Sequence, residues 1–488
     1  MSSEALIGLA LLLPALSALL TPAFGRWPNL REAVTLLFGG VLFTTNVVLA
    51  GRILAGERPE LELVAVLPGL ELAFQVEPLG MLFALVASGL WIVTSCYSIG
   101  YMRGHKEKNQ TRYYTFFAIA IAAAVAIAYS RNLFSLFVFY EALTLSTYPL
   151  VTHHQTETAK RAGRVYLGVL LTTSIGLLLL GMIWTWSLTG TLDFTPGGIL
   201  AGKADDRLCA VLLALFAFGT GKAALMPFHR WLPAAMVAPT PVSALLHAVA
   251  VVKAGVFTVM KICVYIFGTD LLRESGSSIW LMYVAGATIL LASLVAMTKD
   301  NLKARLAYST ISQLSYIVLG AALANAWGVV GGSMHIAMHA MGKITLFFCA
   351  GAFYVAAHKT EVSDMRGIGR RMPVTTTAFL LGSLSVIGLP PMGGTWSKWF
   401  LALGAADAGQ IALMAVLMIS SLLNIAYLLP IPGRGFFCKP EEAGSEPLRI
   451  REAPLFCVVP LSLTALGCVV LFFFADEIYR LLLPIVSP

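Results

Sequence analysis

The sequence predicts an all-α polytopic membrane protein with about fourteen transmembrane helices. Hydrophobic residues make up 58% of the 488 residues and charged residues 12%, against roughly 25% charged residues in a soluble globular protein. Apolar stretches recur along the whole chain, and nearly every charge falls between them. The longest loops, 52–77 and 431–453, are too short for a soluble domain.

Each predicted span is a predominantly apolar stretch of the length that crosses a bilayer, roughly 20 residues. In chain order, the spans are 5–24, 33–51, 78–98, 113–129, 132–152, 163–188, 208–228, 241–266, 278–298, 304–324, 327–357, 374–404, 409–430 and 454–474.

Basic residues are concentrated in alternate loops of this pattern. The positive-inside rule therefore predicts that these loops are cytoplasmic and that both termini lie on the outer side of a bacterial inner membrane. Because the net charge of +8 is distributed over short loops, it does not indicate nucleic-acid binding. The basic runs are Arg103, Lys106, Lys108 and Arg112; Lys160, Arg161 and Arg164; and Arg366, Arg370 and Arg371.

Two spans are interrupted in a similar way. The seventh contains Gly221 and Pro227, and the twelfth contains Gly388 followed by Pro390 and Pro391. Proline removes a backbone donor and kinks a helix, and freed backbone groups are tolerated at membrane depth only within protein or beside water. Paired interruptions in two halves of a chain are typical of inverted-repeat transporters.

Six ionisable residues fall inside the predicted spans, although each charge costs about 2.5–3.5 kcal/mol at the bilayer centre. One acid among several lysines favours a proton or ion path over an electron path or a ligand pocket. Such residues are functional candidates by default. They are Glu141, Lys222, Lys253, Lys261, Lys343 and Lys398.

For each of these residues, a structural role stands beside the functional one, and that structural role differs from residue to residue. Glu141 is either part of a path or a static partner of one lysine. Lys222 and Lys398 each lie next to a helix break and either line a cavity or extend to an interface. Lys253 lies about 18 Å into its helix, which is too deep for its side chain to extend to an interface. Lys261, near the outer end of the same helix, is expected to extend to the interface.

Three histidines accompany the charges. His335, His339 and Lys343 are spaced i, i+4, i+8, which predicts titratable groups about 6 Å apart on one helix face and favours a proton relay. His247 either relays protons or hydrogen-bonds in the core. No metal site or cofactor is expected, because no carboxylate or Cys stands beside the His pair and no C-x-x-C occurs among the seven Cys.

Several motifs resemble the antiporter-like subunits shared by respiratory complex I, Mrp-type Na⁺/H⁺ antiporters and membrane-bound hydrogenases. The resemblance covers nearly the whole chain. The segments that carry it are Phe139-Tyr-Glu141, Gly221-Lys222 with Pro227-Phe-His229, Ala238-Pro-Thr-Pro-Val-Ser-Ala-Leu-Leu-His247, Val252-Lys253, Asp300-Asn-Leu-Lys303-Arg, His339 with Lys343, and Gly388-Leu-Pro-Pro with Lys398.

The resemblance implies two inverted five-helix repeats. The N-terminal helices 1–3 would occupy 1–112, the first repeat 113–266, the second repeat 278–430, and a cytoplasmic loop with helix 14 would occupy 431–488. It also implies that Glu141 and Lys222 form an acid–base pair, that Lys253 is the central relay, that His335, His339 and Lys343 bridge the halves, and that Lys398 is the outlet. Family members assemble with other antiporter-like and small membrane subunits.

A lysine at position 398 and the length of the chain resemble the D-type subunits of Mrp antiporters. This resemblance implies H⁺ as a transported ion and leaves Na⁺ as a second candidate. Complex I subunits of the M or N type, which would be non-redox subunits of an NADH:quinone oxidoreductase, and hydrogenase subunits remain alternatives. Two other classes also remain: a scaffold subunit with an inactive path, and an electron-transfer or quinone-reducing protein. The lack of C-x-x-C spacing and of nucleotide-binding Gly motifs argues against the last.

Overall fold

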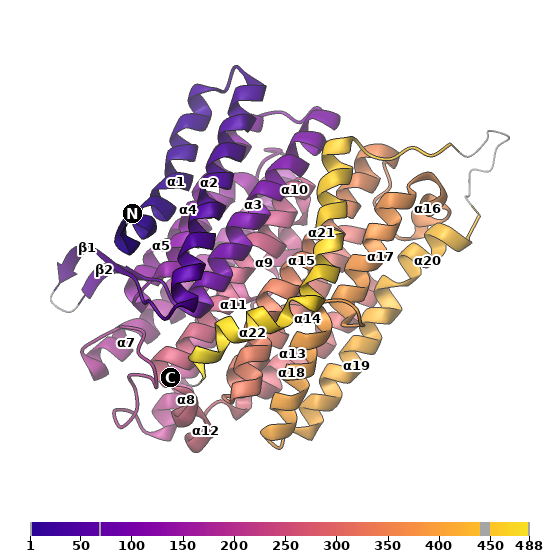
Figure 1. Ribbon diagram of the computed structural model, residues 1–488. Coiled ribbons are helices and arrows are strands. Elements are labelled where there is room, and N and C mark those ends of the chain that lie inside the picture. The colour runs from indigo at the N-terminus through magenta and orange to yellow at the C-terminus, as the bar shows by residue number, and fades with distance from the viewer. Residues whose placement is uncertain (1, 68–69, 440–448, 487–488) are drawn as a thin grey trace.

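The computed structural model describes residues 2–67, 70–439 and 449–486, and these residues form a bundle of roughly parallel and antiparallel helices (Figure 1). Eleven helices among the described residues are long and apolar enough to cross a membrane. Of the other three predicted spans, α14 is more polar, and the seventh and twelfth are divided into shorter helices at their breaks. The prediction of an all-α polytopic membrane protein is confirmed.

The N-terminal part contains three long helices and a hairpin that the sequence analysis did not predict. In the hairpin, β1 pairs antiparallel with β2, from Glu60 opposite Gln75 to Leu67 opposite Leu70. The residues of these strands satisfy backbone groups through this pairing. The elements are α1 (Ser3–Ala23), α2 (Pro28–Leu54), β1 (Glu60–Leu67), β2 (Leu70–Gln75) and α3 (Pro78–Gly104).

The next part contains the first predicted repeat. Several of its helices begin at side chains suited to N-caps: Asn132, Thr156 and Asp205 each accept a hydrogen bond from a backbone N–H three residues later. The elements are α4 (Gln110–Tyr129), α5 (Leu133–Val151), α6 (Glu157–Thr173), η1 (Ser174–Leu178), α7 (Leu179–Thr189), α8 (Asp206–Gly219), η2 (Gly221–Ala223), α9 (Trp231–Ala234), η3 (Ala235–Val237), α10 (Thr240–Ala244), η4 (Leu245–Val249), α11 (Val251–Lys261) and η5 (Ile262–Phe267).

The second predicted repeat follows the same order of two helices, a long helix, a broken helix and a further helix. The inverted relation between the two parts stays a prediction. The elements are α12 (Thr269–Ser275), α13 (Ile279–Thr298), α14 (Leu302–Ala322), α15 (Ala326–Ala357), η6 (Ser363–Met365), α16 (Ile368–Arg371), α17 (Pro373–Ile387), α18 (Gly394–Asp407), α19 (Ile411–Leu428) and α20 (Pro430–Phe437).

The C-terminal part closes the bundle. Helix α21 (Leu455–Phe473) packs against α3, α15 and α17, so it joins the N-terminal helices to the second repeat (Figure 1). Two short helices follow, α22 (Ala475–Leu482) and η7 (Leu483–Ile485). Helix α22, which the sequence analysis did not predict, crosses the bundle and contacts α3 and α15.

Both predicted helix breaks are present. Helix α8 ends at Gly219, and the chain turns through η2 and Ala224, which has a positive φ of 53°. Helix α17 ends at Gly388, whose φ of 88° favours glycine, before α18 starts at Gly394. A cis X-Pro peptide bond lies in each break.

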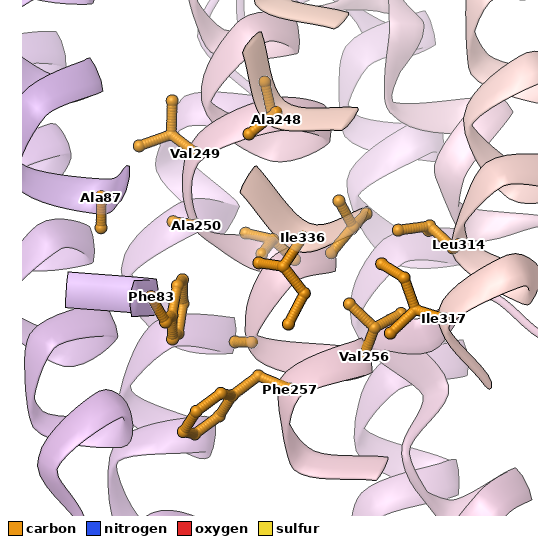
Figure 2. Packing of buried hydrophobic residues seen from close by; sticks show 14 of the residues in the cluster. Phe83, Ala87, Ala248, Val249, Ala250, Val256, Phe257, Leu314, Ile317 and Ile336 are labelled. Atoms are coloured by element: carbon orange, nitrogen blue, oxygen red, sulfur yellow. The ribbon is translucent and has the colours of Figure 1, made fainter. Parts of the chain in front are cut away.

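The core around α11 is apolar. Figure 2 shows Phe83 of α3 beside Phe257 of α11, with their ring centroids 5.1 Å apart, and Leu314, Ile317 and Ile336 nearby from α14 and α15. Val256 of α11 and Ile336 of α15, both labelled in Figure 2, lie close in sequence to Lys253 and His335. Because polar groups inside such an apolar shell lack bulk water, their partners decide what they can do.

Candidate functional site: a buried lysine and histidine axis

The predicted site residues lie on elements from both predicted repeats. Six of them are almost completely buried, with exposed fractions between 0% and 2%: Lys222, His247, Lys253, His335, His339 and Lys343. Glu141 and Lys398 are partly buried. Glu141 lies on α5, Lys222 on η2, His247 on η4, Lys253 on α11, His335, His339 and Lys343 on α15, and Lys398 on α18.

Lys222 occupies the first helix break. Its Nζ donates to the backbone oxygen of Tyr140, at 2.8 Å, and to Thr144 Oγ1, at 2.5 Å. It also lies 3.2 Å from the ring centroid of Tyr140, in a cation–π contact. Trp231 donates to the backbone oxygen of Gly221 and holds the break in place. The groups of α5 that contact the ammonium of Lys222 are therefore neutral.

The acid–base pair of Glu141 and Lys222 stays a prediction, and the structure does not bring the two side chains into direct contact. Both carboxylate oxygens of Glu141 are buried without a hydrogen-bond partner in the part of the chain that the structure describes. The two charges still interact at longer range. The reason for the separation is that Tyr140 and Thr144, from the same helix as Glu141, take the donors of Lys222.

Lys253 makes a direct polar contact between the two predicted repeats. Its Nζ lies 2.6 Å from His339 Nδ1. Lys253 comes from α11 and His339 from α15, so a titratable group of the first predicted repeat touches one of the second. This distance lets a proton pass directly between the two nitrogens.

His335 continues the chain of polar groups from His339, since their ring centroids are 5.8 Å apart. Its Nδ1 lies 2.9 Å from Ser397 Oγ, and its Nε2 lies 3.1 Å from Gln313 Oε1. The ring of Tyr316 stacks on His335 at 5.5 Å between centroids. Contacts from α14, α15 and α18 therefore meet at this histidine.

Lys398 also lies against the ring of Tyr316. Its Nζ is 4.8 Å from the centroid of that ring and donates to the backbone oxygen of Ile387, at 3.0 Å, and to Ser421 Oγ, at 3.1 Å. Since Ile387 is the last residue of α17, the lysine satisfies a carbonyl that the helix break leaves free.

The side chain of Lys343 contacts α14 instead of continuing the predicted row of His335 and His339. Its Nζ lies 2.5 Å from Ser309 Oγ on α14, rather than against His339. Tyr427 OH lies 2.8 Å from the same Ser309 oxygen and also hydrogen-bonds Asn424 Oδ1. Lys343 therefore starts a side branch that runs from α15 through α14 to α19.

His247 lies in η4, a π-helical segment, and its ring packs on Phe347 at 4.7 Å between centroids. Both ring nitrogens are buried, and neither finds a hydrogen-bond partner among the described residues. A core histidine held by hydrogen bonds would show such partners. Both alternatives for His247, relay and core residue, stay predictions.

The prediction for Lys261 is wrong. We expected its side chain to extend to the outer interface, but it is 1% exposed and forms an ion pair with Glu77 at 3.0 Å. Its Nζ also donates to the backbone oxygen of Ser130, and it lies 4.2 Å from the ring centroid of Phe194. Glu77 just before α3, Ser130 just after α4 and Phe194 in the loop after α7 surround the ammonium group in place of water.

Sequence reasoning missed Glu77 and the polar groups that hold the lysines. Ser, Thr and Tyr are frequent in membrane helices, and no spacing distinguished these from the others. The missed residues are Glu77, Tyr140, Thr144, Ser309, Gln313, Tyr316, Ser397, Ser421, Asn424 and Tyr427.

Gly255 lets α11 approach the Lys222 break. A Cβ at this position would lie 2.3 Å from the backbone nitrogen of Ala223 and from the carbonyl carbon of Lys222. We therefore expect Gly255→Ala to destabilise the protein by about 1–3 kcal/mol and to lower its thermal midpoint in detergent. Gly168→Ala is the matched control, because nothing lies within 4 Å of that added Cβ. Equal midpoints for the two variants would contradict the expectation.

Residues 130–424 match the family described as NADH:quinone oxidoreductase/Mrp antiporter, transmembrane region. The chain belongs to this family. All eight candidate residues of this family member, from Glu141 to Lys398, lie within the matched segment.

Relatives of this family member include subunits of several complexes. NADH-quinone oxidoreductase subunit N of Desulforudis audaxviator is 33% identical over 84% of this chain and 83% of its own length. Hydrogenase-4 component B of Escherichia coli K12 is 30% identical, and NADH-quinone oxidoreductase subunit L of Mycobacterium tuberculosis is 32% identical. Each match covers 82% of this chain, which spans 62% and 63% of those two proteins.

Two solved structures share the fold. A chain of the Mrp complex from Dietzia sp. DQ12-45-1b superposes with a TM-score of 0.88 at 22% identity, over 100% of this chain and 97% of that chain. A chain of the membrane-bound sulfane sulfur reductase, an archaeal respiratory membrane complex, superposes with a TM-score of 0.87 at 24% identity, with the same coverage. At these identities, the likeness shows the fold of this family member.

Proposed function

We propose that this chain is a proton-translocating subunit of a multisubunit membrane complex. The contact between Lys253 Nζ and His339 Nδ1, at 2.6 Å across the two repeats, carries the proposal. Protons pass from Lys253 to His339 and His335 and then to Lys398 beside the second helix break. Several relatives are named as subunits or components of larger assemblies, which supports other membrane subunits as partners.

The energy for this movement is within the range of a membrane potential. One charge that crosses 100 mV gains about 2.3 kcal/mol, whereas an unpaired lysine at the bilayer centre costs about 2.5–3.5 kcal/mol on insertion scales. A proton that moves between lysines and histidines in short steps never places a charge alone in lipid. The alternation of basic loops supports an inner-membrane location with both termini outside.

Glu141 is proposed as the acid that controls Lys222. Its buried carboxylate, which has no hydrogen-bond partner among the described residues, lies within electrostatic range of Lys222. We expect Glu141→Ala to abolish proton translocation by the assembled complex in inverted membrane vesicles, while the amount of assembled protein is unchanged. Glu141→Asp, which keeps the charge, is expected to retain part of the transport.

A scaffold subunit with an inactive path is the opposing candidate. Wild-type proton translocation in the Glu141→Ala complex, together with wild-type translocation when Lys222 is replaced, would favour the scaffold. Loss of transport in both variants with normal assembly would favour the proposed path.

We further propose that the complex is an Mrp-type antiporter in which this chain takes the D-type position. The lysine at position 398 supports this subtype, whereas the relatives named above include complex I and hydrogenase subunits. Na⁺-dependent proton release by the purified complex would support the Mrp assignment, and proton release coupled only to quinone reduction would overturn it. The neighbouring genes would distinguish the complexes independently.

A further inference from the structure

The second helix break is held by a helix that belongs to neither predicted repeat. The backbone N–H of Gly393, the residue just before α18, donates to the backbone oxygen of Cys468 in α21, at 2.9 Å. Three residues later, Nε1 of Trp396 donates to the backbone oxygen of Phe472, at 3.0 Å. Because Cys468 and Phe472 are four residues apart, both hydrogen bonds end on one face of α21.

The surfaces around these two hydrogen bonds are in close contact. A Cβ at Gly393 would lie 2.8 Å from the Cβ of Leu471, so glycine lets the break approach α21 this closely. The rings of Trp396 and Phe472 pack with their centroids 5.5 Å apart. Helix α18 therefore meets α21 through both polar and apolar contacts.

Helix α22 extends this contact along α18. Its Tyr479 stacks on Phe400, one turn after Trp396, with ring centroids 5.5 Å apart and an angle of 20° between the rings. Figure 1 shows how α22 crosses the bundle after α21. The C-terminal helices thus contact the first two turns of α18, the helix that carries Lys398.

The hydrogen bond of Trp396 also satisfies a free helix end. Phe472 is the last but one residue of α21, and the last four carbonyls of a helix lack an intrahelical donor. An unpaired carbonyl is costly at membrane depth. In the first break, by contrast, the indole of Trp231 donates to Gly221 of the same break, at 2.9 Å. The second break therefore depends on an element outside its own repeat.

Trp396, Ser397 and Lys398 point in three directions, since successive helical residues are rotated by about 100°. Ser397 Oγ lies 2.9 Å from His335 Nδ1 on α15. Lys398 Nζ donates to the end of α17 and to α19. A rotation of α18 by about 20° would move an atom roughly 5 Å from its axis by about 2 Å. Such a shift breaks a hydrogen bond, so the rotation of α18 sets both contacts.

We propose that Trp396 is a positioning residue for proton transfer between His335 and Lys398. By donating to Phe472, it fixes the rotation of α18 and keeps Ser397 against His335 and Lys398 beside the break. Its indole keeps its own proton throughout and acts only through the helix. This inference rests on the proposed proton path, and it gives α21 and α22 a role in holding the second half of that path.

The test compares two tryptophans of α18 in the assembled complex in proteoliposomes. Trp396→Phe keeps a ring against Phe472 but removes the N–H. We expect proton uptake per assembled complex to be about tenfold slower, because a misplacement of about 1 Å can slow a reaction roughly 100-fold. Trp399→Phe is the matched control, since Trp399 is 58% exposed on the same helix, and it should keep the wild-type rate.

The ratio of the uptake rates in H₂O and D₂O separates positioning from stability. If the transfer between His335 and Lys398 becomes the slow step, this ratio should rise in Trp396→Phe. A complex that is only less stable would lose uptake and keep the wild-type ratio. A wild-type rate, or a slower rate with an unchanged ratio, would overturn the positioning role.

A second replacement serves if Trp396→Phe fails to assemble. Benzothienylalanine at position 396 has nearly the shape of tryptophan but carries sulfur in place of the N–H, and the same loss and the same rise in ratio are expected. Wild-type behaviour of this variant, with transport blocked in Lys253→Ala, would overturn the positioning role alone. If the Lys253→Ala complex still translocates protons, the proposed path fails, and the positioning role fails with it.

Discussion

Replacing Lys253 with alanine is expected to abolish proton translocation and to leave the complex assembled. Lys253 Nζ is the group of the first repeat that touches His339, at 2.6 Å. Alanine removes this nitrogen, and the shortest route from one repeat to the other is lost. A buried residue replaced by a smaller one also leaves a cavity, but no unpaired charge remains behind.

Transport should be measured as proton uptake into inverted vesicles, normalised to the amount of assembled complex. Lys203→Ala is the control, since Lys203 lies in a surface loop and donates only to the backbone oxygen of Thr189. Wild-type uptake by Lys253→Ala would exclude the proposed relay through His339. Loss of the subunit from the complex would instead identify Lys253 as a structural residue.

Replacing Lys261 with methionine is expected to destabilise the protein strongly without blocking transport. Methionine fills much of the space but leaves the carboxylate of Glu77 buried and unpaired. Loss of one partner of a buried ion pair costs about 3–5 kcal/mol. Because Lys261 contacts Glu77, Ser130 and Phe194 rather than the axis, the variant that does assemble should translocate protons normally.

The double variant Lys261→Met with Glu77→Leu separates charge from packing. Removing both charges should recover much of the stability, because apolar pairs often replace buried ion pairs at little cost. The measurement is the thermal midpoint of the purified complex in detergent. A wild-type thermal midpoint for Lys261→Met would contradict this account of the pair. A thermal midpoint of the double variant no higher than that of Lys261→Met would contradict it as well.

The positions of the helices were predictable because their signals are local. A run of apolar residues spans a bilayer wherever it occurs, and proline ends or kinks a helix through its own ring. The breaks near Pro227 and Pro390 were therefore predicted correctly. The β-hairpin and α22 were missed, since short elements in loops give weak periodic signals.

The candidate residues were also predictable from the sequence, because a charged residue in an apolar span is conspicuous and costly. Their partners were not. Glu77 lies outside every predicted span, and nothing in its local sequence pairs it with Lys261. Likewise, the hydroxyls that hold Lys222 and Lys343 are indistinguishable in sequence from other Ser and Thr residues of the helices.

The sequence by itself determined that the chain is a membrane bundle with two broken helices and an interior row of lysines and histidines. Tertiary structure alone decided which of these groups touch. It placed Lys253 against His339, separated Glu141 from Lys222 and buried Lys261 against Glu77. The physical reason is range: hydropathy and helix breaking act over neighbouring residues, whereas a contact of about 3 Å between distant helices depends on how whole faces pack.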